Sequence, residues 1–392
     1  MHKKHIVVIS PAKFPGRAGD TANYSEIINQ LIIEGFQVSL ICPKNDDYDK
    51  ESLEISDHVN IIRIPCKPPR LKQIKNGFKL QHYLRILLFL IVEFFTVSWV
   101  LARKRIRYVF VRHGLLTMQL PIIFRLLKIR VMADGELISD MFNGQINSRI
   151  LSLVKSYEKN IVKLYTYFKV PTYSQAENLQ KFGLPKDRIL IIPICINIKK
   201  IPRFTLEEIP EHTFGYFGAL ELWSGVDVLL EGFELLLKKI PSATLFIIGE
   251  GSLKDSLKET VICKNLGSNV IFASLSREEL WNEYFRKFRI VVNPMLKQTN
   301  SMDSNLPIKL IESLAAGKPI VVMDIPSMKE LPKESVFIVE SASPQALAKA
   351  METLSLDKDR MKRYATVALA SSNNYDIGDK IKNLVSALVE SC

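Results

Sequence analysis

Short apolar runs alternate with amphipathic stretches along almost the whole chain. In the first half, residues 6–10 form a predicted strand, residues 21–34 a predicted helix with one apolar face, and residues 38–42 the next strand. Further strands are predicted at residues 108–112, 130–133, 165–172 and 189–193. Strands that alternate with helices in this way predict a doubly wound parallel sheet of the α/β class.

The same alternation begins again in the second half. Strands are predicted at residues 214–217, 244–249, 269–272 and 290–293, and helices at residues 226–239, 253–263, 277–285 and 376–389. Residues 199–212 lie between the two cycles and combine Pro202 and Pro210 with acidic side chains, which is typical of a linker. At 392 residues the chain is long enough for two domains, each with its own core.

Residues 303–323 carry the strongest local signal. Pro307 suits the first turn of a helix, where its missing N–H costs nothing, and Gly317 ends that helix before a buried strand at residues 320–323. Free amides at the start of a helix attract phosphate, and Glu312 lies far enough along it to accept hydrogen bonds from a ribose diol. The segment predicts a nucleotide site, with an ordinary loop, helix and strand of an α/β domain as the alternative.

These residues also carry a resemblance to a known family. The spacing P-x-K-x-x-E-x-x-A-x-G-K-P resembles the donor-site helix of family 4 glycosyltransferases, and it is formed here by Pro307, Lys309, Glu312, Ala315, Gly317, Lys318 and Pro319. Those are retaining, two-domain enzymes of the GT-B architecture that use nucleotide sugars. Residues 214–227, which include Gly218, are similar to the opening strand and loop of the family's donor domain, and residues 245–251 to its second strand and glycine turn.

The resemblance implies two Rossmann-like doubly wound domains that face a central cleft. Residues 1–198 would form the acceptor-binding domain and residues 199–374 the nucleotide-sugar donor-binding domain. The C-terminal helix, residues 375–392, would cross back to the first domain.

The donor site implied by the resemblance is built mainly on the second domain. Glu312 would hold the ribose, and Lys309 and Lys297 would hold the diphosphate. The other donor-binding candidates are the backbone amides of Leu306, Pro307 and Ile308, and three glycines that permit a close approach of the backbone, Gly16, Gly19 and Gly218.

The candidates on the first domain follow two predicted strands, at the sheet edge where α/β sites form. His113 resembles a histidine that many family members place near the donor sugar, and it is the predicted catalytic residue. Arg112 would orient an acceptor carboxylate or phosphate, and Asp134 and Glu136 would bind an acceptor hydroxyl or act as a base. A purely structural role is the alternative for each of these side chains.

Composition narrows the remaining possibilities. Five scattered cysteines without a C-x-x-C argue against a zinc site or a disulfide framework and for a reducing, cytoplasmic compartment. The net charge is +12, and residues 67–107 hold ten Lys and Arg against a single acid, Glu93, around the apolar stretch 86–102. That stretch predicts a partly buried helix with a basic fringe on an anionic membrane face, a plain core helix, or, least favoured because of Glu93, a membrane span. Nucleic acid is disfavoured as a partner because no nucleic-acid motif is present.

The leading hypothesis is a retaining glycosyltransferase, peripheral to the cytoplasmic membrane face. It would transfer a hexose or N-acetylhexosamine from a UDP- or GDP-sugar to a glycan or lipid-linked acceptor, with no cofactor and no metal. The family's usual basic phosphate contacts are replaced by Ala219 and Ser224, and Ser304 stands where many members have a second glutamate. These departures keep two alternatives open, a non-catalytic glycosyltransferase-like subunit or scaffold and a sugar-nucleotide epimerase.

Overall fold

The computed structural model describes residues 4–11, 14, 19–43, 55–67, 80–141, 148–296 and 306–390. The chain forms two compact units. Unit 1 comprises Met1–Cys195 together with Ile377–Cys392, and unit 2 comprises Ile196–Asp376. The segment predicted as a linker contains only short 3₁₀ turns, at Ile198–Lys200 and Leu206–Glu208.

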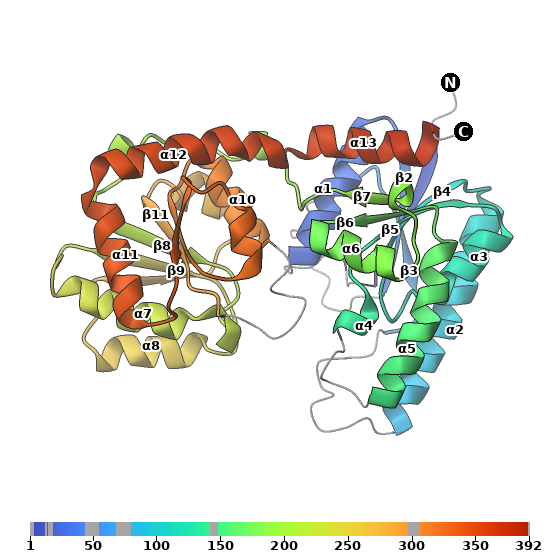
Figure 1. Cartoon of the computed structure of the whole chain (residues 1–392), viewed down its shortest axis with the longest axis horizontal. Coiled ribbons are helices and arrows are strands. Elements are labelled where there is room, and N and C mark those ends of the chain that lie inside the picture. The colour runs from blue at the N-terminus through green and yellow to red at the C-terminus, as the bar shows by residue number, and fades with distance from the viewer. Residues whose placement is uncertain are drawn as a thin grey trace. The chain divides into compact units, whose positions relative to one another are not determined.

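Unit 1 is built on a seven-stranded parallel sheet with the order β3-β2-β1-β4-β5-β6-β7 (Figure 1). Its strands are β1 His5–Ile9, β2 Gln37–Pro43, β3 Asn60–Ile64, β4 Tyr108–Arg112, β5 Arg130–Asp134, β6 Tyr167–Val170 and β7 Ile189–Ile191. Its helices are α1 Gly19–Ile33, α2 Leu80–Arg103, α3 Leu120–Leu126, α4 Ile138–Met141, α5 Ser148–Ile161, α6 Tyr173–Lys181 and α13 Ile377–Glu390. The strand order reverses beside β1, which is the Rossmann arrangement.

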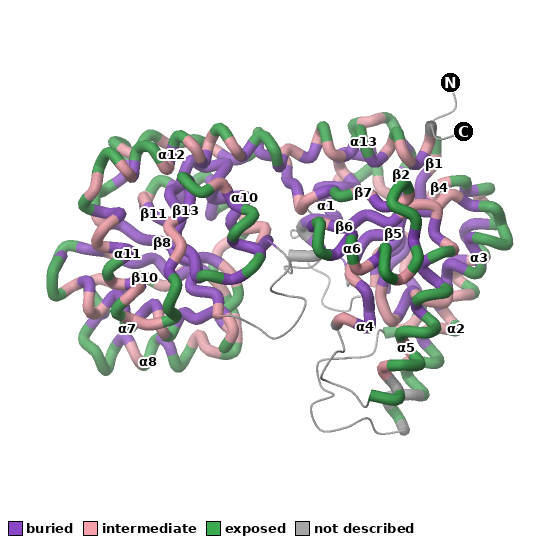
Figure 2. Tube along the Cα trace, viewed as in Figure 1, coloured by how far each residue is buried: buried purple, intermediate pink, exposed green. Residues whose placement is uncertain are grey.

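In the central strands of this sheet, the side chains of alternate residues pack into two hydrophobic cores, one on each face of the sheet. Ile6 and Val8 pack with α1 and α13 on one face, whereas Val7 and Ile9 pack with α2 and α3 on the other. Figure 2 shows the strands as the buried centre and the helices with an exposed outer side. Because successive side chains point to opposite faces of a strand, a continuous apolar run is needed to fill both cores.

Helix α13 is part of unit 1 although it ends the chain. It packs against α1 through Ile377, Ile381, Leu384 and Leu388, whose spacing of three and four residues places them on one helical face. The guanidinium of Arg130 donates to the carbonyls of Leu388 and Val389 at 3.3 and 3.2 Å, which satisfies two acceptors in the last turn of the helix.

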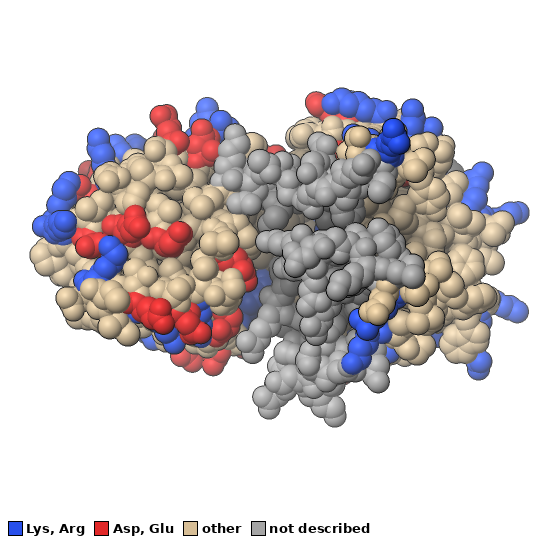
Figure 3. Space-filling view, turned by 90° about the horizontal axis from the view of Figure 1, so that it is seen from below, with Lys and Arg blue, Asp and Glu red and all other residues tan. Residues whose placement is uncertain are grey.

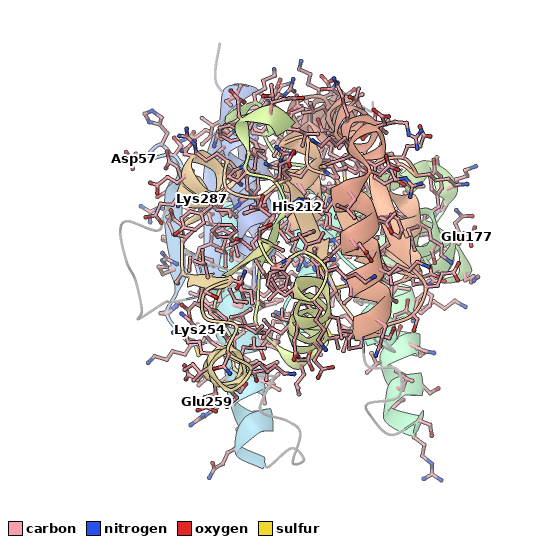
Figure 4. All side chains as sticks on the ribbon, turned by 90° about the vertical axis from the view of Figure 1, so that its left-hand side faces the viewer. Asp57, Glu177, His212, Lys254, Glu259 and Lys287 are labelled. Carbon is pink, nitrogen blue, oxygen red and sulfur yellow. The ribbon has the colours of Figure 1, made fainter. Side chains whose placement is uncertain are left out.

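Unit 2 is built on a six-stranded parallel sheet with the order β10-β9-β8-β11-β12-β13. Its strands are β8 Thr213–Phe217, β9 Thr244–Ile248, β10 Val270–Ala273, β11 Ile290–Asn293, β12 Ile320–Met323 and β13 Val336–Val339. Its helices are α7 Val226–Leu237, α8 Lys254–Cys263, α9 Arg277–Glu279, α10 Ile308–Ala315, α11 Pro344–Leu356 and α12 Lys358–Ser372. Lys254 and Glu259, labelled in Figure 4, belong to α8 at the surface of this unit.

The predicted doubly wound architecture is confirmed, with differences at the sheet edges. The edge strands β3 and β13 and the helices α11 and α12 were not predicted, because half-buried strands and small-residue helices have a weaker apolar period. The helix predicted at residues 277–285 is a single α-helical turn, α9, followed by a π-helical segment, Leu280–Tyr284.

Candidate functional site

The carboxyl end of β8 is shaped by close backbone packing. Gly218 has a φ of +139°, and its N–H donates to the carbonyl of Ile248 at 2.9 Å. A Cβ on Gly249 would lie 1.9 Å from the carbonyl oxygen of Gly218, and one on Gly251 would lie 2.2 Å from that of Leu220. The glycine turns of β8 and β9 are therefore required by their contact with each other, apart from any contact with a ligand.

The ammonium of Lys309 lies beside this turn. Its Nζ is 4.5 Å from the centroid of the Tyr216 ring and 3.3 Å from the position that a Cβ on Gly218 would take. Burial lowers the pKa of Lys309 to about 7, although the carboxylate of Glu312 acts in the opposite direction. The ammonium of Lys309 makes no hydrogen bond or ion pair with the residues that the structure describes, so it is available for an anion; only the backbone carbonyl of Lys309 is bonded, by the hydroxyl of Ser313.

Glu312 is buried and lies next to Arg277, at the start of α9. Its Oε1 accepts from Nε of Arg277 at 2.8 Å and lies 2.7 Å from Nη2. The guanidinium also stacks on the Trp281 ring, 4.8 Å from its centroid. This arrangement holds the carboxylate on one side of α10 through a charge-assisted hydrogen bond.

Helix α10 begins at Ile308, with Pro307 at the N-cap position in an extended conformation. Leu306 lies just before it and is buried. Pro307 has no N–H and cannot donate, which corrects the predicted use of its amide; the first free donor of the helix itself belongs to Ile308. At the other end, Gly317 has a φ of +69° and its N–H donates to the carbonyl of Leu314 at 3.0 Å, as predicted for the glycine stop.

Four further positions of the motif and its surroundings have a defined place in the structure. Lys318 is buried and donates to the carbonyls of Phe285 and Phe288, so this lysine of the motif fastens α10 to the neighbouring loop. Ser224 is buried and donates to the carbonyl of Glu221 at 2.6 Å, and the side chain of Ala219 carries no charge. Asn293, at the end of β11, is buried and its amide has no hydrogen-bond partner among the described residues, which is typical of a group that meets a ligand or water.

On unit 1, Asp134 is the centre of a buried polar cluster at the carboxyl end of the sheet. Its carboxylate accepts from Nζ of Lys169 at 2.7 Å, from the hydroxyl of Tyr24 at 3.2 Å and from Nη1 of Arg112 at 3.4 Å. Burial raises the pKa of Asp134, but the charges of Lys169 and Arg112 outweigh it, and the net shift is downward. A carboxylate that already accepts three hydrogen bonds and has a lowered pKa does not fit the general-base role predicted for Asp134. Asp134 instead holds the guanidinium of Arg112, whose side chain is 29% exposed.

His113 lies inside unit 1. Its Nδ1 is 3.0 Å from the hydroxyl of Tyr165 and its Nε2 is 2.9 Å from Oε1 of Glu158, and the imidazole has no exposed surface. Glu158 also accepts from the backbone N–H groups of Ile138 and Ser139. Because both ring nitrogens are occupied by buried partners, this geometry does not fit direct contact with a sugar, and His113 instead ties β4 to α4 and α5.

The remaining predicted site residues are less defined. Gly16 and Lys297 lie outside the described residues, Gly19 is the first residue of α1, and Glu136 is half-buried just after β5. Within the described part of the chain there is no group of three or more His, Cys, Asp and Glu side chains that could hold a metal ion.

Three charged partners of the predicted residues were not predicted from the sequence: Arg277, Lys169 and Glu158. Lys169 stands within an apolar strand and Glu158 on the inner face of α5, and both are buried. A charged residue at a position where the apolar period requires a hydrophobic one is the signal that would have found these two. Arg277 is half-exposed on a short helix and gave no such signal.

Two family models match the chain. The one described as "Glycosyltransferase Family 4" matches residues 24–200, and the one described as "Glycosyl transferases group 1" matches residues 211–357. An uncharacterized glycosyltransferase of Haemophilus influenzae is 27% identical over 192 residues, which are 47% of this chain and 51% of that protein. A poly(ribitol-phosphate) alpha-N-acetylglucosaminyltransferase of Staphylococcus aureus is 26% identical over 140 residues, 36% of this chain and 26% of that protein. The chain spans about half the length of the first of these relatives, and less of the second.

Solved structures share the fold along almost the whole chain. Sucrose-phosphate synthase from Thermosynechococcus elongatus has a TM-score of 0.72 at 16% identity and covers 97% of both chains. Anabaena HepE (Alr3699), in complex with UDP, has a TM-score of 0.71 at 13% identity and covers 99% of this chain and 100% of its own. Because these identities are low, the structural similarity establishes the fold alone, which is the GT-B architecture of two Rossmann-like domains.

Proposed function

The chain belongs to the group 1, family 4 glycosyltransferases, and from this membership we propose that it transfers a hexose or N-acetylhexosamine from a UDP- or GDP-sugar to a glycan or lipid-linked acceptor. The alpha-N-acetylglucosaminyltransferase among its relatives supports an N-acetylhexosamine, and the UDP complex of HepE supports a uridine nucleotide. The proposed place of action is the cytoplasmic face of a membrane, with anionic lipid as the contact.

The observation that carries the donor site is the free ammonium of Lys309 at the carboxyl end of β8. It lies beside Gly218 and over the Tyr216 ring, without an anionic partner among the described residues. The N-terminus of α10 opens at the same edge of the sheet, so its first amides and Lys309 present positive potential to one region. In the proposed complex this region holds the diphosphate, and it stabilises the charge that develops when the nucleotide leaves.

Glu312 is proposed to orient the nucleoside. Its carboxylate accepts hydrogen bonds from the ribose hydroxyls, while Arg277 keeps it in one rotamer through the contacts of 2.8 and 2.7 Å. Preorganisation of this kind lowers the entropy that the site loses when the nucleotide binds. Arg112, the partly exposed member of the Asp134 cluster, is the proposed contact for an anionic acceptor.

The proposed stereochemical course is retention by attack on the same face of the sugar. No described side chain of the site is placed as a covalent nucleophile, since Glu312 is held by Arg277 and Asp134 by Lys169. The acceptor hydroxyl would then transfer its proton to the departing diphosphate, which Lys309 and the α10 amides hold.

A donor screen tests this proposal directly. Release of UDP or GDP from a panel of nucleotide sugars is measured with a membrane lipid extract as acceptor, and the anomeric configuration of the product is read by NMR. Glu312→Gln should lower kcat/KM for the active donor by about tenfold or more, the cost of one charged hydrogen bond. Glu283→Gln is the matched control, because Glu283 is an exposed carboxylate on the nearby π-helical segment. An inverted product would exclude the retaining course, and full activity of Glu312→Gln would exclude the donor site.

A non-catalytic subunit is the second candidate. It is favoured by one observation, the uncharged side chains of Ala219 and Ser224 in the loop after β8, where the family usually has cations. The two candidates differ in nucleotide binding, which thermal shift measures with UDP and GDP at millimolar concentration. Stabilisation by either nucleotide favours the enzyme, and no stabilisation by any nucleotide favours the subunit.

A further inference from the structure

Helix α2 has two opposite apolar faces. The inward face packs in the core against the sheet of unit 1 through Phe89, Val97 and Val100, which are fully buried. Glu93 is the charged residue on this side; it is also fully buried and accepts from the side-chain amide of Gln119 at 2.6 Å. By length and composition Leu84–Arg103 could cross a membrane, but only 28% of its most apolar window is buried in the protein. Because its inward face packs against the sheet, α2 lies at the surface of unit 1, and its opposite face is exposed.

The outward face is a continuous apolar stripe. It consists of six exposed side chains spaced three or four residues apart: Leu84, Leu87, Leu88, Ile91, Phe95 and Trp99. At 3.6 residues per turn these positions occupy an arc of about 120°, opposite the buried face. Phe95 is 67% exposed and Trp99 is 58% exposed. Leu153 and Tyr157 point outward from α5, which covers the same face of the sheet as α2 (Figure 1). A row of large apolar side chains of this length marks an interaction surface.

The exposed charged side chains of the described helices on this face, α2, α3 and α5, are all basic. Helices α2, α3 and α5 contain only two acidic residues, Glu93 and Glu158, and both are fully buried. Their basic residues are Arg85, Arg103, Arg125, Arg149, Lys155 and Lys159. In the sequence, residues 67–79 precede α2 and contain five more Lys and Arg and no acid. In the view of Figure 3 the acidic side chains gather on unit 2, and the visible part of unit 1 carries mainly basic ones.

We propose that the outward face of α2 is a membrane-docking surface that lies in the plane of an anionic bilayer. Its apolar stripe enters the acyl boundary, and the basic residues at its margin bind lipid headgroups. Arg85 and Arg103 lie five turns apart on the same side of the stripe, and the guanidinium of Arg103 is 5.2 Å from the Trp99 ring. A tryptophan paired with an arginine suits the boundary between headgroups and acyl chains, because each has an apolar body and a polar end.

A second copy of this chain is the other occupant that an apolar stripe suggests. A two-fold dimer through α2 would bring the same basic margin of both copies together. The described residues of α2, α3 and α5 offer no exposed acid to pair with these charges. Charge complementarity therefore favours anionic lipid. This inference specifies the membrane contact of the proposed function, but it does not depend on sugar transfer.

Vesicle sedimentation tests the docking surface. The wild-type chain should bind vesicles of phosphatidylcholine and phosphatidylglycerol in equal parts and bind phosphatidylcholine vesicles much more weakly. Phe95→Ser/Trp99→Ser should weaken binding to the anionic vesicles by at least about a hundredfold, because two large apolar side chains no longer leave water. Ile262→Ser on α8 is the matched control, since Ile262 is an isolated apolar side chain that is 73% exposed, and it should change nothing.

The charge contribution is tested separately. Arg85→Gln/Arg103→Gln should weaken binding to anionic vesicles by about 25-fold, at about fivefold for each cation near the surface. Lys333→Gln/Lys349→Gln removes two exposed cations from unit 2 and should leave binding unchanged. Brominated phosphatidylcholine in the anionic vesicles should quench tryptophan emission of the wild type, and Trp99→Phe should abolish this quenching while it keeps the binding.

Several outcomes would overturn the inference. The inference fails if the wild-type chain does not bind anionic vesicles, or if the stripe variants bind them as the wild type does. It also fails if quenching of tryptophan emission persists in Trp99→Phe. A wild-type dimer that Phe95→Ser/Trp99→Ser converts to a monomer, without vesicle binding, would assign the stripe to a second copy. Circular dichroism should show that the variants are folded. Nucleotide stabilisation of the same samples distinguishes failure of the docking surface from failure of the proposed enzyme.

Discussion

Lys309 is expected to make nucleotide binding depend on pH in the neutral range. Burial at the carboxyl end of β8 lowers the pKa of its ammonium to about 7, so the unliganded residue is about half protonated at pH 7. A diphosphate bound beside it favours the protonated form. Nucleotide affinity should therefore be highest at and below pH 7. It should fall as the pH rises, until the pH passes the pKa of Lys309 in the nucleotide complex.

The size of the effect follows from this pKa and from Coulomb's law. One phosphate charge about 4 Å from the ammonium, at an effective dielectric constant of about 20, contributes about 4 kcal/mol, which raises the pKa of Lys309 in the complex by about three units. Between pH 7 and that value the dissociation constant should rise by about tenfold for each pH unit. From pH 7 to pH 8.5 the expected loss of affinity is about fifteenfold.

Isothermal titration calorimetry with UDP, or with GDP if that is the nucleotide bound, measures this loss across pH 7 to 8.5. Lys309→Gln should bind weakly at pH 7 and show no slope, whereas Lys309→Arg should show no slope and bind more tightly than the wild type at pH 8.5. Lys287→Gln is the control, because Lys287 (labelled in Figure 4) also lies over a tyrosine ring, 3.7 Å from the centroid of Tyr284. A wild-type affinity that is constant over this range, or a slope that persists in Lys309→Gln, would refute the assignment.

Three further predictions concern stability, measured by urea unfolding. Gly249→Ala should destabilise unit 2 by about 3 kcal/mol or more, because the added Cβ would lie 1.9 Å from a backbone oxygen. Gly267→Ala is the control: there is open space around Gly267, so stability should change by less than about 0.5 kcal/mol. His113→Ala should cost unit 1 about 2 to 4 kcal/mol, because the buried carboxylate of Glu158 loses the imidazole and keeps only its backbone N–H donors, and UDP affinity should be unchanged. A loss of affinity with normal stability would restore a ligand-binding role for His113. Burial raises the pKa of Glu93 to about 8, above its ordinary 4.5, so the folded state holds this proton more tightly. Stability should fall as the pH rises from 4.5 to 8, and Glu93→Gln should reduce that dependence.

Most strands and helix α10 could be predicted from the sequence, because local patterns specify them. The strands at 108–112 and 290–293 were predicted to the residue, and Gly317 ends α10 as its missing Cβ allows. The spacing of Lys309 and Glu312 on α10 is likewise a property of helical geometry, and the resemblance to the family follows from the sequence alone. The apolar and basic residues of α2 are evident from the sequence. Composition alone does not show which face of the helix is buried and which is exposed.

Partnerships between distant residues were decided only by the tertiary structure. Glu312 meets Arg277 from 35 positions away, Asp134 meets Lys169 from 35 positions away, and His113 meets Glu158 from 45 positions away. Each of these pairs forms because a parallel sheet brings the ends of separate strands, and the helices that cover them, to one place. Sequence order encodes which side of its own helix or strand a side chain occupies, whereas its availability to a ligand depends on what the rest of the chain packs against it. For that reason the sequence could propose Lys309 and His113 as site residues, and only the fold could show that the ammonium of Lys309 has no hydrogen-bond or ion-pair partner among the described residues and that His113 is enclosed.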